Sequence, residues 1–584
     1  MRGFRVCFPL PNRGCENMNN GMERLEEKIR KEIGGLLLGV EKPYPDQLYL
    51  YVERTKLPEV CSYVYYELGG FLSTMAGSDE RSLHGAYRLY YVFSIEEGYE
   101  DGKKPWVVVV TNIPPHDTKF SSVTPKIPAA SWYEREVRDL LGLVPENHPD
   151  PRRLVLPDDW PEGVHPLRKE FTYTERPPSV ARKCEFRPSV EGEGIMQVPI
   201  GPVHAVADEP GQFRVFLDGE KVVDVDYRMF YVHRGIEKLA ESRLTYNQVP
   251  FIAERICGIC GYAHSCAYCQ AVEQALGIEV PERALYIRTL MLEVERLHSH
   301  LLNLGLACHL AGFDWGFMAF FKAREKVMYM AELLTGGRKT YGMNVVGGVR
   351  RDITEDRAKK ALEILKEVEK EYKAVLDAVL STSTLVSRAK DVGVLPRDVA
   401  RKVSVVGPVA RGSSIKRDTR KDHPYAAYSE VDFKVPVHSE GDVLARLSVR
   451  AEETFETISI IRQVLENMPG GPIQAEVKEY RPYARGLGYV EAPRGEDVHF
   501  VITGPHSKVY RWRVRASTYN NWPAIPYMCR GYTLADLPLI IGSIDPCYSC
   551  TERVIVVDVK SGRTRVFPYE YLVSLSRKGG KPWA

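Results

Sequence analysis

The spacing of apolar residues changes along the chain and divides it into two halves of different character. Residues 86–95 and 104–113 are rich in β-branched and aromatic side chains, which predicts strands. Residues 131–144 place apolar side chains at helical spacing, and residues 22–40 read as one amphipathic helix. Helical and strand patterns thus alternate over residues 22–175 and predict one domain that contains both helices and strands.

Long helical patterns dominate the second half. Apolar residues recur at three- and four-residue spacing over residues 282–306, 354–380 and 441–468. Thr354 opens the second pattern, where a hydroxyl side chain is a preferred N-cap. We expect these segments to form long helices at the core of a bundle.

Strand patterns flank the helical region. Residues 211–228 read as a hairpin that turns at Asp218 and Gly219. Residues 497–504 and 508–515 are rich in β-branched and aromatic residues and read as strands. The second domain is therefore expected to be mainly helical, with β-strands at its periphery.

Proline punctuates the region between the two halves. Residues 148–171 contain too many prolines for regular structure, and residues 176–195 are polar and broken, which is typical of a linker. We place the domains at residues 22–175 and 196–553, with residues 554–584 as a C-terminal extension.

Composition narrows the class of protein. The chain has 584 residues, too many for one hydrophobic core. Its net charge is +2, from 79 basic and 77 acidic residues, which gives no electrostatic reason to bind nucleic acid. No stretch approaches the roughly 18 uninterrupted apolar residues of a membrane-spanning helix. We expect a protein of the reducing cytosol, where cysteine pairs favour metal or redox sites.

Six of the twelve cysteines are clustered. They are spaced as three Cys-x-x-Cys pairs: Cys257 with Cys260, Cys266 with Cys269, and Cys547 with Cys550. Four thiolates from such pairs make a soft-ligand site whose usual occupant is zinc or an iron–sulfur cluster. The four cysteines between residues 257 and 269 could form that site alone, or the first pair could join the C-terminal pair. Spacing alone does not choose between the two arrangements.

The residues around the cysteines carry a resemblance to a known family. The segments are HRGIEK at 233–238, RICGICGYAHS at 255–265, APRGE at 492–496 and DPCYSC at 545–550. Together they resemble the large, catalytic subunit of nickel–iron hydrogenases. Two cysteine pairs with matching flanks, in the order found in the family, make this resemblance specific.

The resemblance extends to respiratory complex I. Residues 132–160 resemble its 30-kilodalton subunit, and the hydrogenase-like part also resembles its 49-kilodalton subunit. A fusion of these two modules is the architecture of the large subunit in formate hydrogenlyase and hydrogenase-4-type complexes, the group 4, membrane-bound hydrogenases. The implied fold is multidomain, with an α+β N-terminal domain followed by a mainly α-helical domain with peripheral β-strands.

The resemblance also implies a nickel–iron centre. Cys257 and Cys547 would be terminal ligands of nickel, and Cys260 and Cys550 would bridge nickel and iron; thiolates suit both metals. The iron would carry cyanide and carbon monoxide. Electrons would come from a [4Fe-4S] cluster in a partner subunit. A magnesium ion or a further iron ion is neither implied nor excluded.

Five further residues match positions that serve the centre in the family. Glu237 resembles the proton-transfer glutamate, Arg494 resembles the arginine over the open face of the metals, and Asp545 would orient that arginine. His264 would donate a hydrogen bond to a bridging sulfur, and Arg255 would brace the same loop. Without the resemblance, Glu237, Arg494, Asp545 and His264 also fit, in that order, a surface glutamate, a turn arginine, a turn aspartate and a satisfied core histidine.

The sequence departs from the family pattern at two positions. Ser299 stands where some hydrogenases carry an aspartate, and Arg553 stands where most carry a histidine. Many of these large subunits are made with a C-terminal extension that a dedicated protease removes after nickel insertion. By resemblance, the cut falls between Arg553 and Val554, so residues 554–584 are expected to be removed.

These observations give one leading hypothesis. The chain is expected to be the catalytic large subunit of an energy-converting hydrogenase that reduces protons to H2 reversibly. Its expected partners are a small iron–sulfur subunit similar to the 20-kilodalton subunit of complex I, a ferredoxin-like subunit, integral membrane subunits, a maturation protease and metal-insertion proteins. These partners would hold it, as a peripheral subunit, at the cytoplasmic side of the membrane.

Two alternatives stay open at this stage. A quinone-reductase-type subunit of complex I would hold no metal, and His204 is compatible with that function. A zinc or iron–sulfur scaffold would use the cysteines differently, and Cys266 and Cys269 keep that alternative open.

Overall fold

The structure is a computed structural model of the chain. It describes residues 15–96, 104–175, 177–180, 192–202, 210–231, 233–477 and 480–548. His204, Cys550 and Arg553 lie outside the described residues, as do the expected cleavage site and most of the expected linker.

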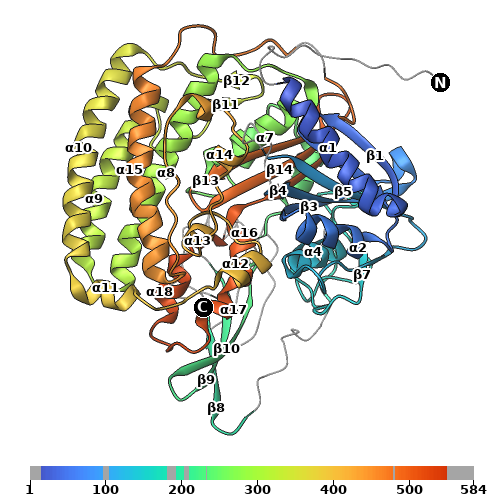
Figure 1. The fold of residues 1–584 in the computed structure, drawn as a ribbon, viewed down its shortest axis with the longest axis horizontal. Helices are drawn as coiled ribbons and strands as arrows, with labels where there is room; N and C mark the ends of the chain where they lie inside the picture. Colours follow the sequence, from blue (N-terminus) through green and yellow to red (C-terminus); the bar gives the residue numbers. More distant parts are fainter. Residues whose placement is uncertain are drawn as a thin grey trace, which may run out of the picture.

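The N-terminal module, residues 15–175, is built on a five-stranded sheet (Figure 1). The strands are β1 (Leu37–Tyr44), β2 (Gln47–Val52), β3 (Gly70–Glu80), β4 (Ala86–Ile95) and β5 (Trp106–Ile113). They lie in the order β1-β2-β5-β4-β3, and neighbours are antiparallel except β2 with β5. The strands predicted over residues 86–95 and 104–113 are confirmed, and β3 forms one edge of the sheet.

Two helices of this module were predicted from the sequence, and one prediction was partly wrong. The helix predicted over residues 22–40 ends earlier, because α1 (Cys15–Ile33) stops before Gly34 and strand β1 takes up the following residues. Glycine loses more backbone freedom in a helix than any other residue. Helix α4 (Ser131–Leu141) is confirmed, and it ends at Gly142, whose φ of 74° is a common helix stop.

Long helices form the other side of the molecule (Figure 1). They are α8 (Glu282–Leu310), α9 (Asp314–Thr335), α10 (Glu355–Leu380) and α15 (Val443–Glu466). Three of them match the predicted patterns, and the hydroxyl of Thr354 accepts a hydrogen bond from the backbone of Arg357 as the predicted N-cap. None of the helices in the described residues is long and apolar enough to cross a membrane.

A buried three-stranded sheet lies between the bundle and the N-terminal module (Figure 1). Its antiparallel strands are β13 (Arg485–Ala492), β14 (Gly495–Thr503) and β15 (Val509–Arg515). Helix α7 (Gly261–Leu276) packs so closely on it that a Cβ at Gly488 would lie 1.9 Å from the carbonyl oxygen of Ala267. Every residue of β14 is buried.

The N-terminal module docks on this sheet through an arginine ladder, defined as Arg511, Arg513 and Arg515. These alternate residues of β15 point to the same side and donate from Nε to backbone carbonyls of edge strand β3. The acceptors are Gly77 at 2.7 Å, Met75 at 3.1 Å and Ser73 at 2.6 Å. The ladder satisfies carbonyls that an edge strand would otherwise leave unpaired.

The remaining elements connect these layers. A third sheet contains β8 (Ile195–Ile200), β9 (Gln212–Asp218) and β10 (Lys221–Arg228), and it confirms the predicted hairpin. Small two-stranded sheets pair β6 (Lys119–Ser121) with β7 (Val144–Glu146) and β11 (Asn344–Val345) with β12 (Gly348–Val349). Short helices are α2 (Leu57–Ser62), α3 (Arg81–His84), α5 (Ile236–Arg243), α6 (Val249–Ala253), α11 (Ser383–Ala389), α12 (Arg397–Lys402), α13 (Gly407–Arg411), α14 (Thr419–Asp422), α16 (Ser517–Asn521), α17 (Ile525–Cys529) and α18 (Leu537–Ser543).

Candidate metal centre

Two distant segments bring cysteines together at the end of α7. Cys257 and Cys260 lie in the turn between α6 and α7, and Cys547 follows α18. The Sγ atoms of Cys257 and Cys547 are 3.2 Å apart, although 290 residues separate them in the sequence. All three side chains are buried. The fold therefore joins the first Cys-x-x-Cys segment to the C-terminal one.

The donor set fits a metal bound by thiolates. A separation of 3.2 Å between sulfurs is far longer than the ~2.05 Å of a disulfide, and these cysteines are free thiols. Backbone N–H groups of Ile259 and Cys260 point to Cys257 Sγ at 3.3 and 3.4 Å. Such donors stabilise a thiolate, which is the metal-binding form of cysteine.

Cys266 and Cys269 lie elsewhere, inside helix α7. Both are fully buried, Cys266 in the core of the helical bundle and Cys269 in the core between α7 and the central sheet. Burial raises the pKa of Cys266 to about 12, so its thiol stays protonated. These two cysteines behave as small apolar core residues.

Arg494 lies at the turn between β13 and β14 and contacts the segment that precedes Cys547. Its Nη2 donates to Oδ1 of Asp545 at 2.8 Å, its Nε donates to the Asp545 carbonyl at 2.9 Å, and its Nη1 donates to Ser299 Oγ at 3.2 Å. Burial alone would lower the pKa of Arg494, but Asp545 and the thiols of Cys260, Cys257 and Cys547 raise it above its ordinary value. Arg494 is therefore a fixed cation beside the sulfurs.

Asp545 is held in an unusual backbone conformation. Its φ is 56°, in the left-handed region that aspartate tolerates better than most residues. Together with the two hydrogen bonds from Arg494, this conformation fixes the start of the segment that carries Cys547. The expected pairing of Arg494 with Asp545 is therefore present in the structure.

Glu237, in the first turn of α5, forms ion pairs with two residues of the arginine ladder. Its carboxylate lies 2.8 Å from Arg511 and 3.4 Å from Arg513, and it accepts a hydrogen bond from the backbone of Val514 at 3.0 Å. Burial alone would raise the pKa of Glu237, but Arg511 and then Arg513 outweigh it, so the pKa falls below its ordinary value. Glu237 is therefore held as an ionised carboxylate.

A second carboxylate shares the same arginine. Glu136, on helix α4 of the N-terminal module, pairs with Arg513 at 2.7 and 3.0 Å. Burial raises the pKa of Glu136, and the charge of Glu237 raises it further. A cavity of about 100 Å³ lies against Glu136, Glu237 and Ile256, the residue before Cys257. Two carboxylates with opposite pKa shifts thus border one cavity that reaches the cysteine segment.

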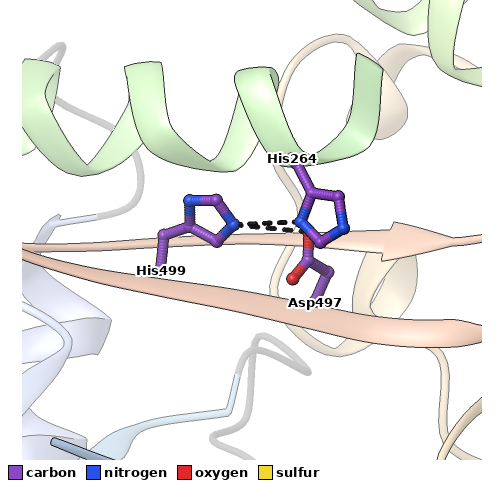
Figure 2. Close-up of side chains that lie close together, drawn as sticks. All are labelled: His264, Asp497 and His499. Carbon is purple, nitrogen blue, oxygen red and sulfur yellow. Dashed lines mark hydrogen bonds and ion pairs between the residues drawn. The ribbon is translucent and has the colours of Figure 1, made fainter. Parts of the chain in front are cut away.

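His264 lies one turn into α7, facing Cys260. Its Nε2 is 3.9 Å from Cys260 Sγ, and its Nδ1 is 2.8 Å from Oδ2 of Asp497 (Figure 2). Burial alone would lower the pKa of His264, but the carboxylate of Asp497 reverses that effect and raises it. The side chain is placed to donate a hydrogen bond to the Cys260 sulfur.

Comparison with known proteins places this site in a family. The model of the respiratory-chain NADH dehydrogenase 30 Kd subunit matches residues 50–177, and that of the 49 Kd subunit matches residues 311–487 and 481–553. The nickel-dependent hydrogenase model matches residues 234–367. Formate hydrogenlyase subunit 5 of Escherichia coli (strain K12) is 50% identical over 555 residues, covering 94% of this chain and 97% of that protein. Hydrogenase-4 component G of the same strain is 48% identical over 559 residues, covering 95% and 97%.

This chain belongs to the family of large subunits of complex-I-like, membrane-bound nickel–iron hydrogenases. A solved structure of the membrane-bound sulfane sulfur reductase, an archaeal respiratory membrane complex, contains a chain with the same fold. That chain is 29% identical with a TM-score of 0.59, covering 62% of this chain and 99% of its own length.

Membership confirms the central hypothesis drawn from the sequence. The chain is a hydrogenase large subunit with a fused 30-kilodalton-like module, and its family implies a nickel–iron centre. Its relatives are subunits of membrane-bound complexes. These findings support the hydrogenase hypothesis over the metal-free and zinc-scaffold alternatives.

Arg255 occupies the outer rim of this hydrogenase site. Its side chain is 54% exposed and its guanidinium stacks over the ring of Tyr341, 5.4 Å from the centroid. The Tyr341 hydroxyl in turn donates to the Cys257 carbonyl at 2.8 Å. Arg255 therefore reaches the cysteine turn through Tyr341 rather than directly.

Sequence reasoning missed several residues of the site. Glu295 on α8 accepts hydrogen bonds from the backbone of Tyr262 and Ala263 at 2.7 and 2.9 Å, which fixes the first turn of α7. Asp497 and His499 stand behind His264 on strand β14. A sequence signal for Asp497 and His499 was available, because polar residues at positions i and i+2 of an otherwise apolar strand point to one face. Glu295 has no comparable signal inside its long helix.

Proposed function

We propose that this chain reduces protons to H2, reversibly, at a nickel–iron centre held by Cys257, Cys260, Cys547 and Cys550. The observation that carries the proposal is the 3.2 Å approach of the Cys257 and Cys547 sulfurs. Two Cys-x-x-Cys segments that meet in a buried site supply several thiolates to one small volume, which suits soft metals.

The chain's own residues would serve the centre in distinct ways. When bound, the centre supplies the redox chemistry that interconverts H2 with protons and electrons. Arg494 places a permanent positive charge beside the sulfurs, and Asp545 fixes the direction of its guanidinium. A preorganised charge in a buried site stabilises developing charge more effectively than water does.

Protons would leave or reach the site through Glu237. The ionised carboxylate accepts a proton and, because Arg511 and Arg513 lower its pKa, passes it on readily. The cavity between Glu237 and Glu136 is the expected next stage, because burial raises the pKa of Glu136 while the two arginines lower that of Glu237, which favours movement of a proton from Glu237 to Glu136.

The surroundings of the chain complete the proposal. The iron would carry cyanide and carbon monoxide, and a [4Fe-4S] cluster in a small partner subunit would deliver electrons. A ferredoxin-like subunit and integral membrane subunits would hold the chain at the cytoplasmic side of the membrane. We also propose that the two domains extend over residues 22–175 and 196–553.

Maturation is the last part of the proposal. A protease would cut between Arg553 and Val554 after metal-insertion proteins have loaded the centre. Intact mass measured on the active enzyme should therefore show the loss of residues 554–584. An active, metal-loaded chain that still ends at Ala584 would contradict the cut.

Metal content is the decisive experiment. The complex is purified anaerobically from its native host, and nickel and iron per chain are measured by mass spectrometry for wild type and for the variants Cys257→Ser and Cys547→Ser. We expect close to one nickel with at least one iron in wild type, and loss of nickel and of H2 turnover in both variants. The control is Cys529→Ser, which alters a fully buried cysteine of the hydrophobic core.

The outcomes separate the competing functions. Nickel loss confined to the two site variants supports the thiolate centre. Zinc alone, or a chain without metal that carries quinone, would show that the complex I resemblance describes the function better. Retention of nickel in Cys257→Ser would contradict the assignment of that residue as a ligand.

A further inference from the structure

Three buried side chains of the central sheet lie behind His264. Asp497 and His499 come from β14, and Trp512 comes from β15. The His499 Nε2 atom is 3.2 Å from His264 Nδ1 and 3.6 Å from Asp497 Oδ2 (Figure 2). The indole nitrogen of Trp512 is 3.2 Å from His499 Nδ1.

The cluster has the composition of a metal site. The ligand atoms of His264, Asp497 and His499 lie within 4.8 Å of one another, and two imidazoles with a carboxylate can hold a divalent ion. The neighbour of His499 argues against that function. The indole Nε1–H of Trp512 is only a donor, so His499 Nδ1 must accept from it. A metal-bound imidazole needs its other nitrogen to donate instead.

The direction of the hydrogen bonds follows from the indole. With Nδ1 of His499 accepting, the proton of the neutral ring is on Nε2, which points toward Asp497 and His264. Burial lowers the pKa of His499, which favours the neutral ring. His499 therefore presents its Nε2–H to the Asp497 carboxylate, and its lone pair, on Nδ1, accepts from the indole and is not free for a metal.

The chain of contacts fixes which edge of His264 faces the cysteine. Asp497 Oδ2 lies 2.8 Å from Nδ1 of His264, so that nitrogen is engaged on the side of the sheet. The opposite nitrogen, Nε2, is then turned to the Cys260 sulfur at 3.9 Å. A rotation of the ring would break the contacts with Asp497 and His499 together.

The location of the three residues makes this support rigid. Asp497 and His499 alternate on the face of β14 that packs on α7, and β14 pairs with β13 over residues 495–502 and with β15 over residues 498–503. Trp512 is fully buried and packs edge-on against Tyr268 of the same helix, with ring centroids 5.5 Å apart. Side chains on a central strand hold a geometry better than side chains on loops.

We propose that Asp497, His499 and Trp512 are positioning residues that hold His264 with its Nε2–H directed at the sulfur of Cys260. The inference rests on the proposed function in one respect, namely that Cys260 is a ligand of the metal centre. Its structural half, the direction of the hydrogen bonds, does not depend on the metal.

The structural half is tested by nuclear magnetic resonance on the full-length chain labelled with [15N]histidine. The ring of His499 is identified by the signal that disappears in His499→Gln. We expect a neutral ring with its proton on Nε2 in wild type, and a changed tautomer signal in Trp512→Phe. A His499 ring with its proton on Nδ1 would overturn the inference whatever the metal content.

The functional half is tested on the anaerobically purified complex. Trp512→Phe should keep its nickel, lower H2 turnover by about tenfold to a hundredfold, as loss of an outer hydrogen-bond partner of a ligand typically does, and shift the midpoint potential of the nickel signal. The matched control is Trp522→Phe. Trp522 is also fully buried, and its Nε1 has no hydrogen-bond partner among the described residues.

A pair of substitutions at residue 499 separates positioning from mere packing. His499→Gln keeps a donor and an acceptor and should retain more turnover than His499→Leu, which keeps neither. Equal turnover and unchanged potential in Trp512→Phe and both residue 499 variants would overturn the positioning role. Retention of nickel in all of the cysteine variants would instead contradict the proposed function, and the tautomer result would still stand.

Discussion

Loss of Arg513 should strongly lower the stability of the fold, because this residue contacts both domains and two carboxylates. It pairs with Glu136 at 2.7 Å, lies 3.4 Å from Glu237 and donates to the Met75 carbonyl at 3.1 Å. In Arg513→Met, Glu136 keeps its burial but loses its cation. Breaking a buried ion pair by removing one partner costs about 3–5 kcal/mol.

The prediction is a loss of about 4 kcal/mol in the free energy of unfolding, measured by urea unfolding of the full-length chain. Adding Glu136→Gln removes the uncompensated charge, so the double variant should recover about half of that loss. The matched control is Arg530→Met. Arg530 is 47% exposed and pairs with Asp224, and such surface pairs contribute only about 0–1 kcal/mol.

Two results would refute the reasoning. If Arg513→Met were as stable as the Arg530→Met control, the interface would not depend on the arginine ladder. If Glu136→Gln added to the loss instead of reducing it, then the pairing of Glu136 with Arg513 would not be the source of the cost.

Three further predictions concern single side chains. Glu237→Gln should keep its nickel but lower H2 turnover by at least about a hundredfold, because it removes the proton-carrying carboxylate. The control is Glu241→Gln on the same helix, 3.0 Å from Arg511, which should leave turnover near wild type. Equal effects of the two variants in a turnover assay would contradict this role of Glu237. Arg494→Lys should lower turnover about a hundredfold with nickel retained, because the ammonium group of lysine lacks the planar fork with which Arg494 reaches both the carboxylate and the carbonyl of Asp545. Full activity in the same assay would exclude a role for the fork. His148 accepts a hydrogen bond from the Asp150 backbone through Nδ1, and burial and then Arg135 lower its pKa to about 4, so the folded protein loses stability as pH falls from about 6.5 toward 4. His148→Gln should reduce this loss by about 2 kcal/mol between about pH 7 and pH 4.5, measured by urea unfolding. Unchanged acid sensitivity of the variant would contradict the prediction.

Local pattern was enough to predict several helices and strands of the fold. Strands β4 and β5 and helices α4, α8, α10 and α15 follow the spacing of their apolar residues. Helix α7 escaped prediction because nearly all of its residues are buried, so it lacks the polar stripe that marks an amphipathic helix. The end of α1 was misplaced because the apolar run after Gly34 and Gly35 suits a strand as well as a helix.

The site was predictable only where the family resemblance reached. Spacing could not have joined Cys257 to Cys547 across 290 residues, and the motif did. The contact between His264 and His499, 235 residues apart, depends on how α7 packs on β14 and is visible only in the folded chain. The lowered pKa of Glu237 likewise comes from arginines on a strand that follows it by more than 270 residues.

The arginine ladder has a mechanical consequence. The same two guanidinium groups, on Arg511 and Arg513, grip the edge of the N-terminal sheet through their Nε atoms and the Glu237 carboxylate through their Nη atoms. Strand β3 is therefore connected to Glu237 through single arginine side chains, with no loop between them. If Glu237 carries protons as proposed, a partner that binds the N-terminal module and displaces β3 would therefore also change how readily Glu237 gives up a proton.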